Sequence, residues 1–231
     1  MMGASPSTQV TELYDASTNR YFSPVCPGQF SRLNAEQYET LPLAVFDSGM
    51  LLQHPYIRNR VIANVDFTGE GPGDSNGHGT MVTLLCLAHT PTKNLINVKI
   101  LDAHGRGKEQ WLIDGLDWIA SWAATHRKLT FANISAGIFH RRLGLFKCNA
   151  QCALAAALER AVHARVVVSL AAGNSGPNRI PCPQLAVLRG LVAALVVQEC
   201  AVDTREPMAY SGPGNFKAAT PACAWHQCEG N

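Results

Sequence analysis

The sequence has 231 residues, 47% of them apolar, which favours one large domain with a sizeable core over two small domains. Its net charge of +2 is too small for the positive surface that non-specific nucleic-acid binding needs. The first twenty residues lack the apolar run of a secretory signal, and no apolar stretch reaches the roughly 20 residues that cross a bilayer. We expect no nucleic-acid or membrane partner and an intracellular location by default, or secretion if the N-terminus is incomplete.

The eight cysteines would allow four disulfides, but a chain of this length does not need such cross-links to fold. Cys148 and Cys152 lie one helical turn apart, and Cys223 and Cys228 flank His226. Neither group has the Cys-x-x-Cys pairs of structural zinc sites. We therefore predict no metal site, favour buried or paired thiols, and leave their redox state open.

Residues 1–40 carry scattered Ser, Thr, Pro and Asn without periodicity, which predicts a loosely ordered extension before a domain at 41–231. In that domain, short apolar runs alternate with segments whose apolar residues recur every three or four positions, so the runs predict strands and the periodic segments predict helices. The predicted strands are Leu43–Asp47, Leu95–Leu101, Thr130–Ser135, Val166–Ala172 and Leu191–Val197. The predicted helices are His78–His89, Glu109–His126 and Ala150–Ala164.

This alternation predicts an α/β fold, a doubly wound parallel sheet with helices on both faces. We interpret the nearly apolar stretch from Leu185 to Val197 as one buried strand with its lead-in. In folds of this class, functional sites lie beyond the carboxyl ends of the strands. Polar residues at the strand exits are therefore the first candidates.

The first strand ends on a carboxylate, in Phe46-Asp47-Ser48-Gly49. The Ser-Gly turn that follows should hold Asp47 at the rim of the sheet. On its own, an aspartate in this place is more often a turn or helix-capping residue than a functional one.

A histidine opens the next predicted helix, in Asp74-Ser75-Asn76-Gly77-His78-Gly79-Thr80. The flanking glycines allow another backbone or a substrate to approach the imidazole closely, and the helix fixes the direction of the ring. A lone histidine is usually a satisfied polar residue. This glycine pattern at a helix start is much rarer, so it favours a function for His78.

An asparagine follows the predicted strand Val166–Ala172, in Ala171-Ala172-Gly173-Asn174. Its amide is a neutral donor that is suited to stabilising an oxyanion. The alternative role of Asn174 is simply to adopt a left-handed turn conformation.

Together these motifs resemble the subtilisin-like serine proteases, the subtilase or S8 peptidase family. Members of that family carry Asp-Ser-Gly or Asp-Thr-Gly after a strand and His-Gly-Thr at a helix start, matched here by Asp47-Ser48-Gly49 and His78-Gly79-Thr80. They also carry a Ser-Leu-Gly-like strand that pairs with substrate and an Ala-Ala-Gly-Asn segment, in whose places Ser135-Ala136-Gly137 and Ala171-Ala172-Gly173-Asn174 stand. The resemblance extends from about residue 41 to about residue 216.

The resemblance implies a serine endopeptidase that acts on peptides or proteins and needs no cofactor, with structural calcium possible but not assignable to residues. It implies that Asp47 orients His78 and stabilises its charged form, that His78 is the general base, and that Asn174 donates to the oxyanion. The substrate-binding residues that it implies are Ser135, Ala136, Gly137, Ala172 and Gly173.

The sequence departs from the family pattern in two places. After Thr80 the helix continues Met81-Val82-Thr83-Leu84, where the family has a histidine or another polar residue and then Val-Ala-Gly, so its packing is expected to differ. The Gly-Thr-Ser-Met-Ala motif that carries the nucleophilic serine is absent, so we expect a fold that is incomplete at its C-terminus. Ser175 and Ser211 follow Asn174, but neither opens an apolar helix, and we predict that neither is the nucleophile.

Three functions remain open. The first is an endopeptidase domain whose serine lies in a missing segment or on a partner. The alternative is a catalytically inactive protease fold that binds peptides or regulates a partner. A weaker third hypothesis is an unrelated α/β binding domain, which a structure with Asp47 and His78 far apart would support.

Overall fold

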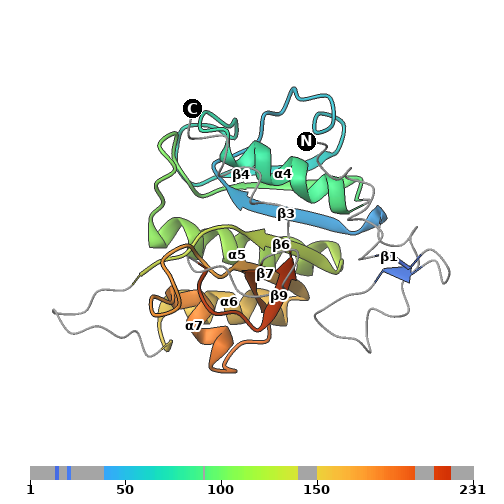
Figure 1. Cartoon of the computed structure of the whole chain (residues 1–231). Coiled ribbons are helices and arrows are strands. Elements are labelled where there is room, and N and C mark those ends of the chain that lie inside the picture. The colour runs from blue at the N-terminus through green and yellow to red at the C-terminus, as the bar shows by residue number, and fades with distance from the viewer. Residues whose placement is uncertain are drawn as a thin grey trace, which may run out of the picture. The chain divides into compact units, whose positions relative to one another are not determined.

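The structure, a computed structural model, describes residues 14–15, 20–21, 39–90, 92–139, 150–200 and 211–219. Figure 1 shows the chain with its elements labelled. The chain divides into two compact units. The first comprises Met1–Ile134 and Arg160–Val168, and the second comprises Ser135–Glu159 and Ser169–Asn231.

Four parallel strands form the sheet of the first unit, in the order β4-β5-β3-β6. They are β3 (Pro42–Asp47), β4 (Val61–Asp66), β5 (Asn94–Lys99) and β6 (Thr130–Ile134). Because each neighbouring pair is parallel, the carboxyl ends of the strands meet at one edge of the sheet. The register places Lys99 opposite both Asp47 and Asp66, so three charged residues stand side by side at this edge.

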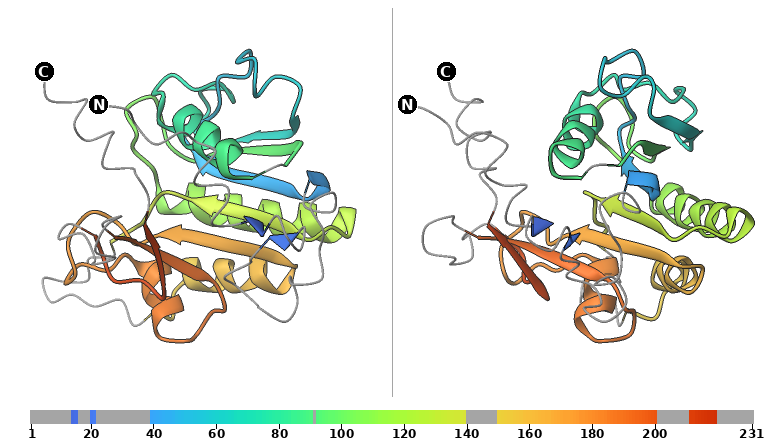
Figure 2. Two further views of the ribbon diagram at one scale, coloured as in Figure 1. Left: turned by 45° about the vertical axis from the view of Figure 1, so that its right-hand side comes forward. Right: turned by 90° about the vertical axis from the view of Figure 1, so that its right-hand side faces the viewer.

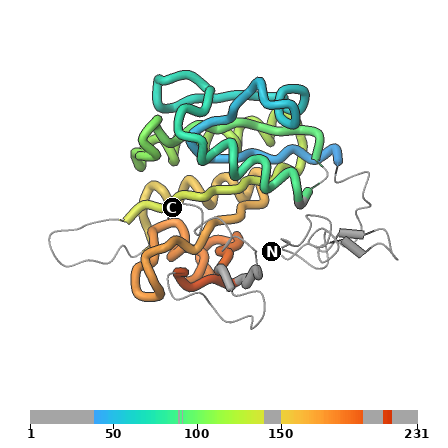
Figure 3. Tube along the Cα trace, turned by 45° about the horizontal axis from the view of Figure 1, so that its top comes forward, coloured from blue at the N-terminus to red at the C-terminus, as the bar shows by residue number. Residues whose placement is uncertain are grey.

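Two helices, α4 (His78–His89) and α5 (Glu109–His126), cover opposite faces of this sheet (Figures 2 and 3). Successive side chains along a strand point to opposite faces. Val45 of β3 lies in an apolar cluster with residues of α4. Phe46 points to the other face, where a Cβ atom at Gly115 of α5 would lie 3.0 Å from its ring. The predicted arrangement of helices on both faces is therefore present in the first unit.

Sequence and structure agree closely for the helices of the first unit, since α4 and α5 begin and end at the predicted residues. The strand β4 was missed, because it alternates between half-buried and exposed residues, with Ile62 47% exposed, and is interrupted by Asn64. Two predicted strands were too long, since β5 ends at Lys99 and β6 ends before Ser135.

Three parallel strands and two helices belong wholly or partly to the second unit, and β7 and α6 have residues in both units. The strands are β7 (Val166–Ala171), β8 (Leu195–Cys200) and β9 (Phe216–Ala219), and the helices are α6 (Ala153–His163) and α7 (Cys182–Leu188). Two elements are shorter than predicted, since β7 ends before Ala172 and α6 lacks the first three and the last of the residues assigned to it.

The predicted strand Leu191–Val197 overlaps β8 only in part, and the stretch from Leu185 that was interpreted as its lead-in is partly helical. Residues up to Leu188 belong to α7, and β8 begins only at Leu195. Pro183 stands in the first turn of α7, where a helix needs no N–H from it, and Gly190 takes a left-handed φ of 71° just after the helix. A short apolar run does not by itself distinguish a buried helix from a strand, and β9, with four residues, was missed as well.

Two short strands, β1 (Tyr14–Asp15) and β2 (Arg20–Tyr21), pair antiparallel within the segment that was expected to be loosely ordered. The domain boundary near residue 40 stays a prediction. In the ranges that the structure describes, no helix is both long enough and apolar enough to span a membrane.

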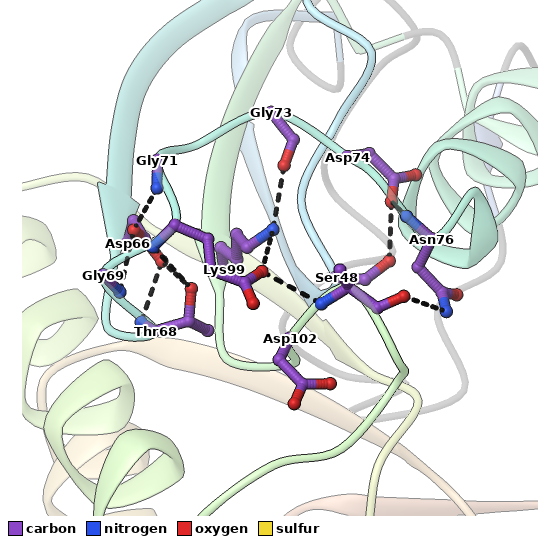
Figure 4. A network of polar contacts seen from close by, with 12 residues as sticks. Ser48, Asp66, Thr68, Gly69, Gly71, Gly73, Asp74, Asn76, Lys99 and Asp102 are labelled. Carbon is purple, nitrogen blue, oxygen red and sulfur yellow. Dashed lines mark hydrogen bonds and ion pairs between the residues drawn. The ribbon is translucent and has the colours of Figure 1, made fainter.

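A fully buried lysine holds the loop between β4 and α4 at the edge of the sheet (Figure 4). The Nζ atom of Lys99 donates to the carbonyl oxygen of Gly73 at 2.9 Å and lies 3.4 Å from a carboxylate oxygen of Glu70. At the end of β4, Asp66 accepts hydrogen bonds from three backbone N–H groups of the same loop. Because a buried ammonium group is stable only when it is paired, these contacts fix the loop that leads to His78.

Replacing Lys99 by alanine should lower the free energy of unfolding by about 3 kcal/mol, because it removes a buried side chain and one donor to the Gly73 carbonyl. Urea unfolding followed by circular dichroism measures this loss. The matched control is Lys93→Ala, since Lys93 is 68% exposed and pairs with Glu39 near the surface. That substitution should cost less than about 1 kcal/mol. Equal losses for the two variants would contradict the structural role of Lys99.

Candidate active site

Asp47 and His78, which the motifs place in one site, are in contact in the first unit. The Nδ1 atom of His78 lies 2.7 Å from Oδ1 of Asp47. Asp47 is the last residue of β3, and His78 is the first residue of α4. The expected hydrogen bond is therefore present, and it joins a carboxylate that is 1% exposed to an imidazole that is 43% exposed.

The surroundings of this pair favour a protonated imidazole. The hydrogen bond to Asp47 raises the pKa of His78, burial of the ring opposes the increase, and the negative charges of Asp47 and Asp74 add to it. The Oδ1 atom of Asp47 also accepts the backbone N–H of Ser48 at 2.7 Å, whereas Oδ2 is buried and accepts no hydrogen bond from the described residues. Since Nδ1 is occupied by the carboxylate, Nε2 is the nitrogen that can exchange a proton with another group.

Glycines allow the two segments of the site to lie very close together. A Cβ atom at Gly79 would lie 2.2 Å from the carbonyl oxygen of Gly49, and one at Gly49 would lie 2.6 Å from the carbonyl oxygen of Gly73. Gly49 also has a φ of 108°, which residues with side chains rarely adopt. The predicted close approach of another backbone beside His78 is present, and that backbone is the turn after Asp47.

Asp74, to which the motifs assign no role, contacts both segments of the site. It accepts a hydrogen bond from the hydroxyl of Ser48, which follows β3 (Figure 4). It also accepts hydrogen bonds from the backbone N–H and the hydroxyl of Thr80 in the first turn of α4. The sequence did carry a signal for this residue. An aspartate at the start of a Ser-Asn-Gly turn commonly accepts hydrogen bonds from the backbone that follows it.

The predicted substrate-binding residues Ser135, Ala136 and Gly137 directly follow β6 and lie in the second unit. Gln184 of α7 is 1% exposed, and its Nε2 atom donates to the carbonyl oxygens of Ala136 at 3.3 Å and Ala171 at 2.8 Å. This side chain therefore ties together the two segments that were expected to meet substrate. Gln184 was missed because no helix was predicted here, and the apolar stretch that follows it from Leu185 was interpreted as the lead-in to a strand.

The segment expected to hold the oxyanion donor follows β7. Ala172 is buried, Gly173 has a φ of 88°, and Asn174 is exposed. The N–H of Gly212 donates to the carbonyl oxygen of Gly173 at 2.8 Å, and a Cβ atom at Gly212 would lie 2.3 Å from the carbonyl oxygen of Ala172. Ser211 beside it is only 4% exposed, which fits a packing role in this turn better than that of a nucleophile.

The structure thus brings Asp47 and His78 together in the first unit and places the other predicted site residues in the second. Ser175 lies exposed in the bend after Asn174. Within the described part of the chain, no three or more His, Cys, Asp and Glu side chains are grouped so that they could hold a metal ion.

Two cysteine thiols lie close together in the second unit, with the Sγ atoms of Cys152 and Cys182 3.0 Å apart. We expect oxidised glutathione to convert them to a disulfide: one thiolate attacks the glutathione disulfide, and the second then displaces the bound glutathione as its thiol. Burial and the charge of Asp47 raise the pKa of Cys86 to about 12, so this thiol should stay reduced and serves as an internal control.

Mass spectrometry of unreduced peptides would detect the cross-link between Cys152 and Cys182, and Cys152→Ser should abolish it. Complete alkylation of both thiols after oxidation would contradict the prediction. So would a cross-link from Cys182 to a different cysteine.

The fold and this geometry define the class of protein, an α/β protein with a buried carboxylate and an imidazole paired where a parallel strand ends. A model of the subtilase family of peptidases matches residues 40–225. The chain therefore belongs to the subtilase family, as its motifs predict.

Curated relatives include both a fungal and a bacterial protein. The chain is 33% identical over 138 residues to the subtilase-type proteinase RRT12 of Saccharomyces cerevisiae. This alignment covers 56% of this chain and 26% of that protein. It is 31% identical over 146 residues to subtilisin E of Bacillus subtilis, and this alignment covers 59% of this chain and 35% of that protein. The chain spans between about a quarter and a half of the length of the curated relatives that it matches.

Solved structures with the same fold include Sphericase, which matches 88% of this chain with a TM-score of 0.62 at 21% identity. A cold-adapted subtilisin-like serine proteinase matches 88% of this chain with a TM-score of 0.59 at 20% identity. The chain covers 64% and 67% of those two structures. These matches confirm the predicted subtilisin-like α/β fold.

Proposed function

We propose that this chain, with residues 41–231 acting as one domain, takes part in serine-type hydrolysis of peptide bonds. The observation that carries the proposal is the 2.7 Å contact between Nδ1 of His78 and Oδ1 of Asp47. A buried carboxylate at Nδ1 fixes the tautomer of the ring and leaves Nε2 to accept a proton from a nucleophile.

In this reaction His78 takes the proton of an attacking serine hydroxyl and later returns it to the leaving amine. Asp47 remains ionised and stabilises the imidazolium that forms in between. The sequence has no recognisable motif for this serine, which is therefore supplied by a further segment or by a partner.

The second unit supplies the substrate contacts. The side-chain amide of Asn174 donates to the oxyanion of the tetrahedral intermediate, and Ser135, Ala136 and Gly137 pair with the backbone of an extended peptide. The contact of Gln184 with the carbonyl oxygens of Ala136 and Ala171 supports this assignment, because it holds the two segments in a fixed arrangement.

The test is to supply the missing hydroxyl. The chain is joined after Asn231 to a subtilisin segment that bears the Gly-Thr-Ser helix, and hydrolysis of a chromogenic peptide is measured. We expect turnover from this fusion and none when either the grafted serine or His78 is replaced by alanine. Turnover that survives His78→Ala would overturn the proposal.

The absence of a Gly-Thr-Ser motif favours a second candidate, an inactive protease fold that binds peptides. The same fusion separates the two functions. If no fusion turns over but extended peptides shift the amide resonances of Ser135, Ala136 and Gly137, the chain is a peptide-binding protein. If neither turnover nor shifts occur, peptide recognition by this chain is excluded.

A further inference from the structure

Asp74 uses both of its carboxylate oxygens, and it accepts five hydrogen bonds from described residues. Oδ1 accepts the hydroxyl of Ser48 at 2.9 Å and the backbone N–H groups of Asn76 at 3.0 Å and Gly77 at 2.8 Å. Oδ2 accepts the backbone N–H of Thr80 at 2.8 Å and its hydroxyl at 2.6 Å. The donors come from the turn after β3, from the loop itself and from the start of α4.

Each of the two hydroxyl groups that donate to Asp74 also accepts a hydrogen bond from a backbone N–H group. The Oγ atom of Ser48 accepts the backbone N–H of Gly79 at 3.0 Å, and the Oγ1 atom of Thr80 accepts the backbone N–H of Leu51 at 2.9 Å. A hydroxyl has a single hydrogen to donate, and here that hydrogen points to Asp74. The carboxylate therefore orients both hydroxyls so that their lone pairs face the opposite segment.

These two bridges run in opposite directions between the same segments. Ser48 is the neighbour of Asp47 and reaches Gly79, the neighbour of His78. The bridge through Thr80 starts in α4 and reaches the turn after β3. Together they fix the start of α4 against that turn, and so they fix the place where the imidazole meets the carboxylate.

We infer that Asp74 is a positioning residue for His78, acting through the hydroxyls of Ser48 and Thr80. The inference rests on the proposed function of His78 as a general base. It assigns Asp74 no contact with substrate.

Electrostatics support the same role. Burial opposes ionisation of Asp74, but the hydrogen bonds from Thr80, Gly77 and Ser48 outweigh it and lower the pKa of this carboxyl, so Asp74 is negatively charged at neutral pH. The charged groups that act on His78 are Asp47 from β3 and Asp74 from the loop before α4, and both raise its pKa.

The alternative is that Asp74 only stabilises its loop. Asp66 provides the matched control, because it also accepts hydrogen bonds from its own loop, from the N–H and hydroxyl of Thr68 and the N–H groups of Gly69 and Gly71. Its pKa is likewise lowered by these bonds against the effect of burial. Asp66 is not among the groups that act on His78.

The experiment is an NMR titration of the His78 ring in the 231-residue chain, which requires neither serine nor substrate. Asp74→Asn should lower the pKa of His78 by about half a unit or more and weaken the signal of the hydrogen-bonded Nδ1 proton. Asp66→Asn should leave both unchanged, although it removes a comparable set of hydrogen bonds. An unchanged pKa and Nδ1 signal in folded Asp74→Asn would overturn the inference.

If Asp74→Asn does not fold, two less disruptive variants of Thr80 provide the same test. Thr80→Val removes one bridging hydroxyl, whereas Thr80→Ser keeps it, so the first should shift the His78 titration and the second should restore the original behaviour. Identical titrations for this pair would also overturn the inference. If no serine-bearing fusion hydrolyses peptides but these shifts occur, the proposed function fails while the positioning role of Asp74 stands.

Discussion

A fluorophosphonate probe should leave the 231-residue chain unlabelled, and its peptide hydrolysis should be undetectable in ordinary assays. A base and an oxyanion donor have little to assist when no serine hydroxyl attacks the carbonyl. Loss of the nucleophile lowers turnover about two million-fold in subtilisin, a relative of this chain, and we expect an effect of that order here.

Two serines near the candidate site, Ser48 and Ser211, are poorly placed to replace the nucleophile because they are buried. Ser48 is 0% exposed, and its hydroxyl donates to Asp74. Ser211 is 4% exposed. Stoichiometric labelling that maps to one serine and disappears in His78→Ala would show that this chain does contain its nucleophile, and active subtilisin provides the positive control for the probe.

In a serine-bearing fusion that turns over, Asp47→Asn should lower kcat about 10⁴-fold and change KM little. An asparagine keeps the shape of the side chain, but it can donate to Nδ1 and so favours the tautomer in which Nε2 carries the proton and cannot act as a base. Steady-state kinetics measure the loss. The control is Asp117→Asn, because Asp117 of α5 is a partly exposed partner of Arg160 and should affect kcat little. A loss of less than tenfold in Asp47→Asn would contradict the assigned role.

The pH dependence of the same variant gives an independent check. The base form of His78 requires loss of its proton, so activity should rise with pH through the raised pKa of the folded chain. The charged imidazole also stabilises the fold, and that contribution is fully present below the ordinary pKa of 6.5 and is lost as the pH rises through the raised value. Asp47→Asn should move both transitions toward lower pH.

Much of the first unit was predictable because its signals are local. Leu112, Leu116 and Ile119 recur at helical spacing, and all three are buried in α5. The meeting of Asp47 and His78 was predictable from the family motifs together with the rule that strand exits gather at one edge. Their catalytic roles, and that of Asn174, stay proposals.

What escaped prediction depends on packing between distant segments. The contact of Gln184 with the carbonyl oxygens of Ala136 and Ala171 joins residues 48 and 13 positions away in the chain. Asp74 reaches Ser48 across 26 positions. Neither side chain belongs to an apolar pattern, so only the folded chain reveals its partners. The helix α7 was missed for a different reason. Its apolar residues were interpreted as the lead-in to a strand, because a short buried helix and a buried strand have similar compositions.

The tight meeting of Gly49 and Gly79 has a consequence for building hybrids with related proteases. The carbonyl oxygen of Gly49 occupies the place that a methyl group on residue 79 would need. The turn after β3 and the start of α4 therefore have complementary surfaces that pack in direct backbone contact. Residues 47–51 and 73–80 should therefore be transplanted as a single block. A hybrid that takes only one of these segments from a donor would combine two backbones that are not matched to one another at the Asp47–His78 pair.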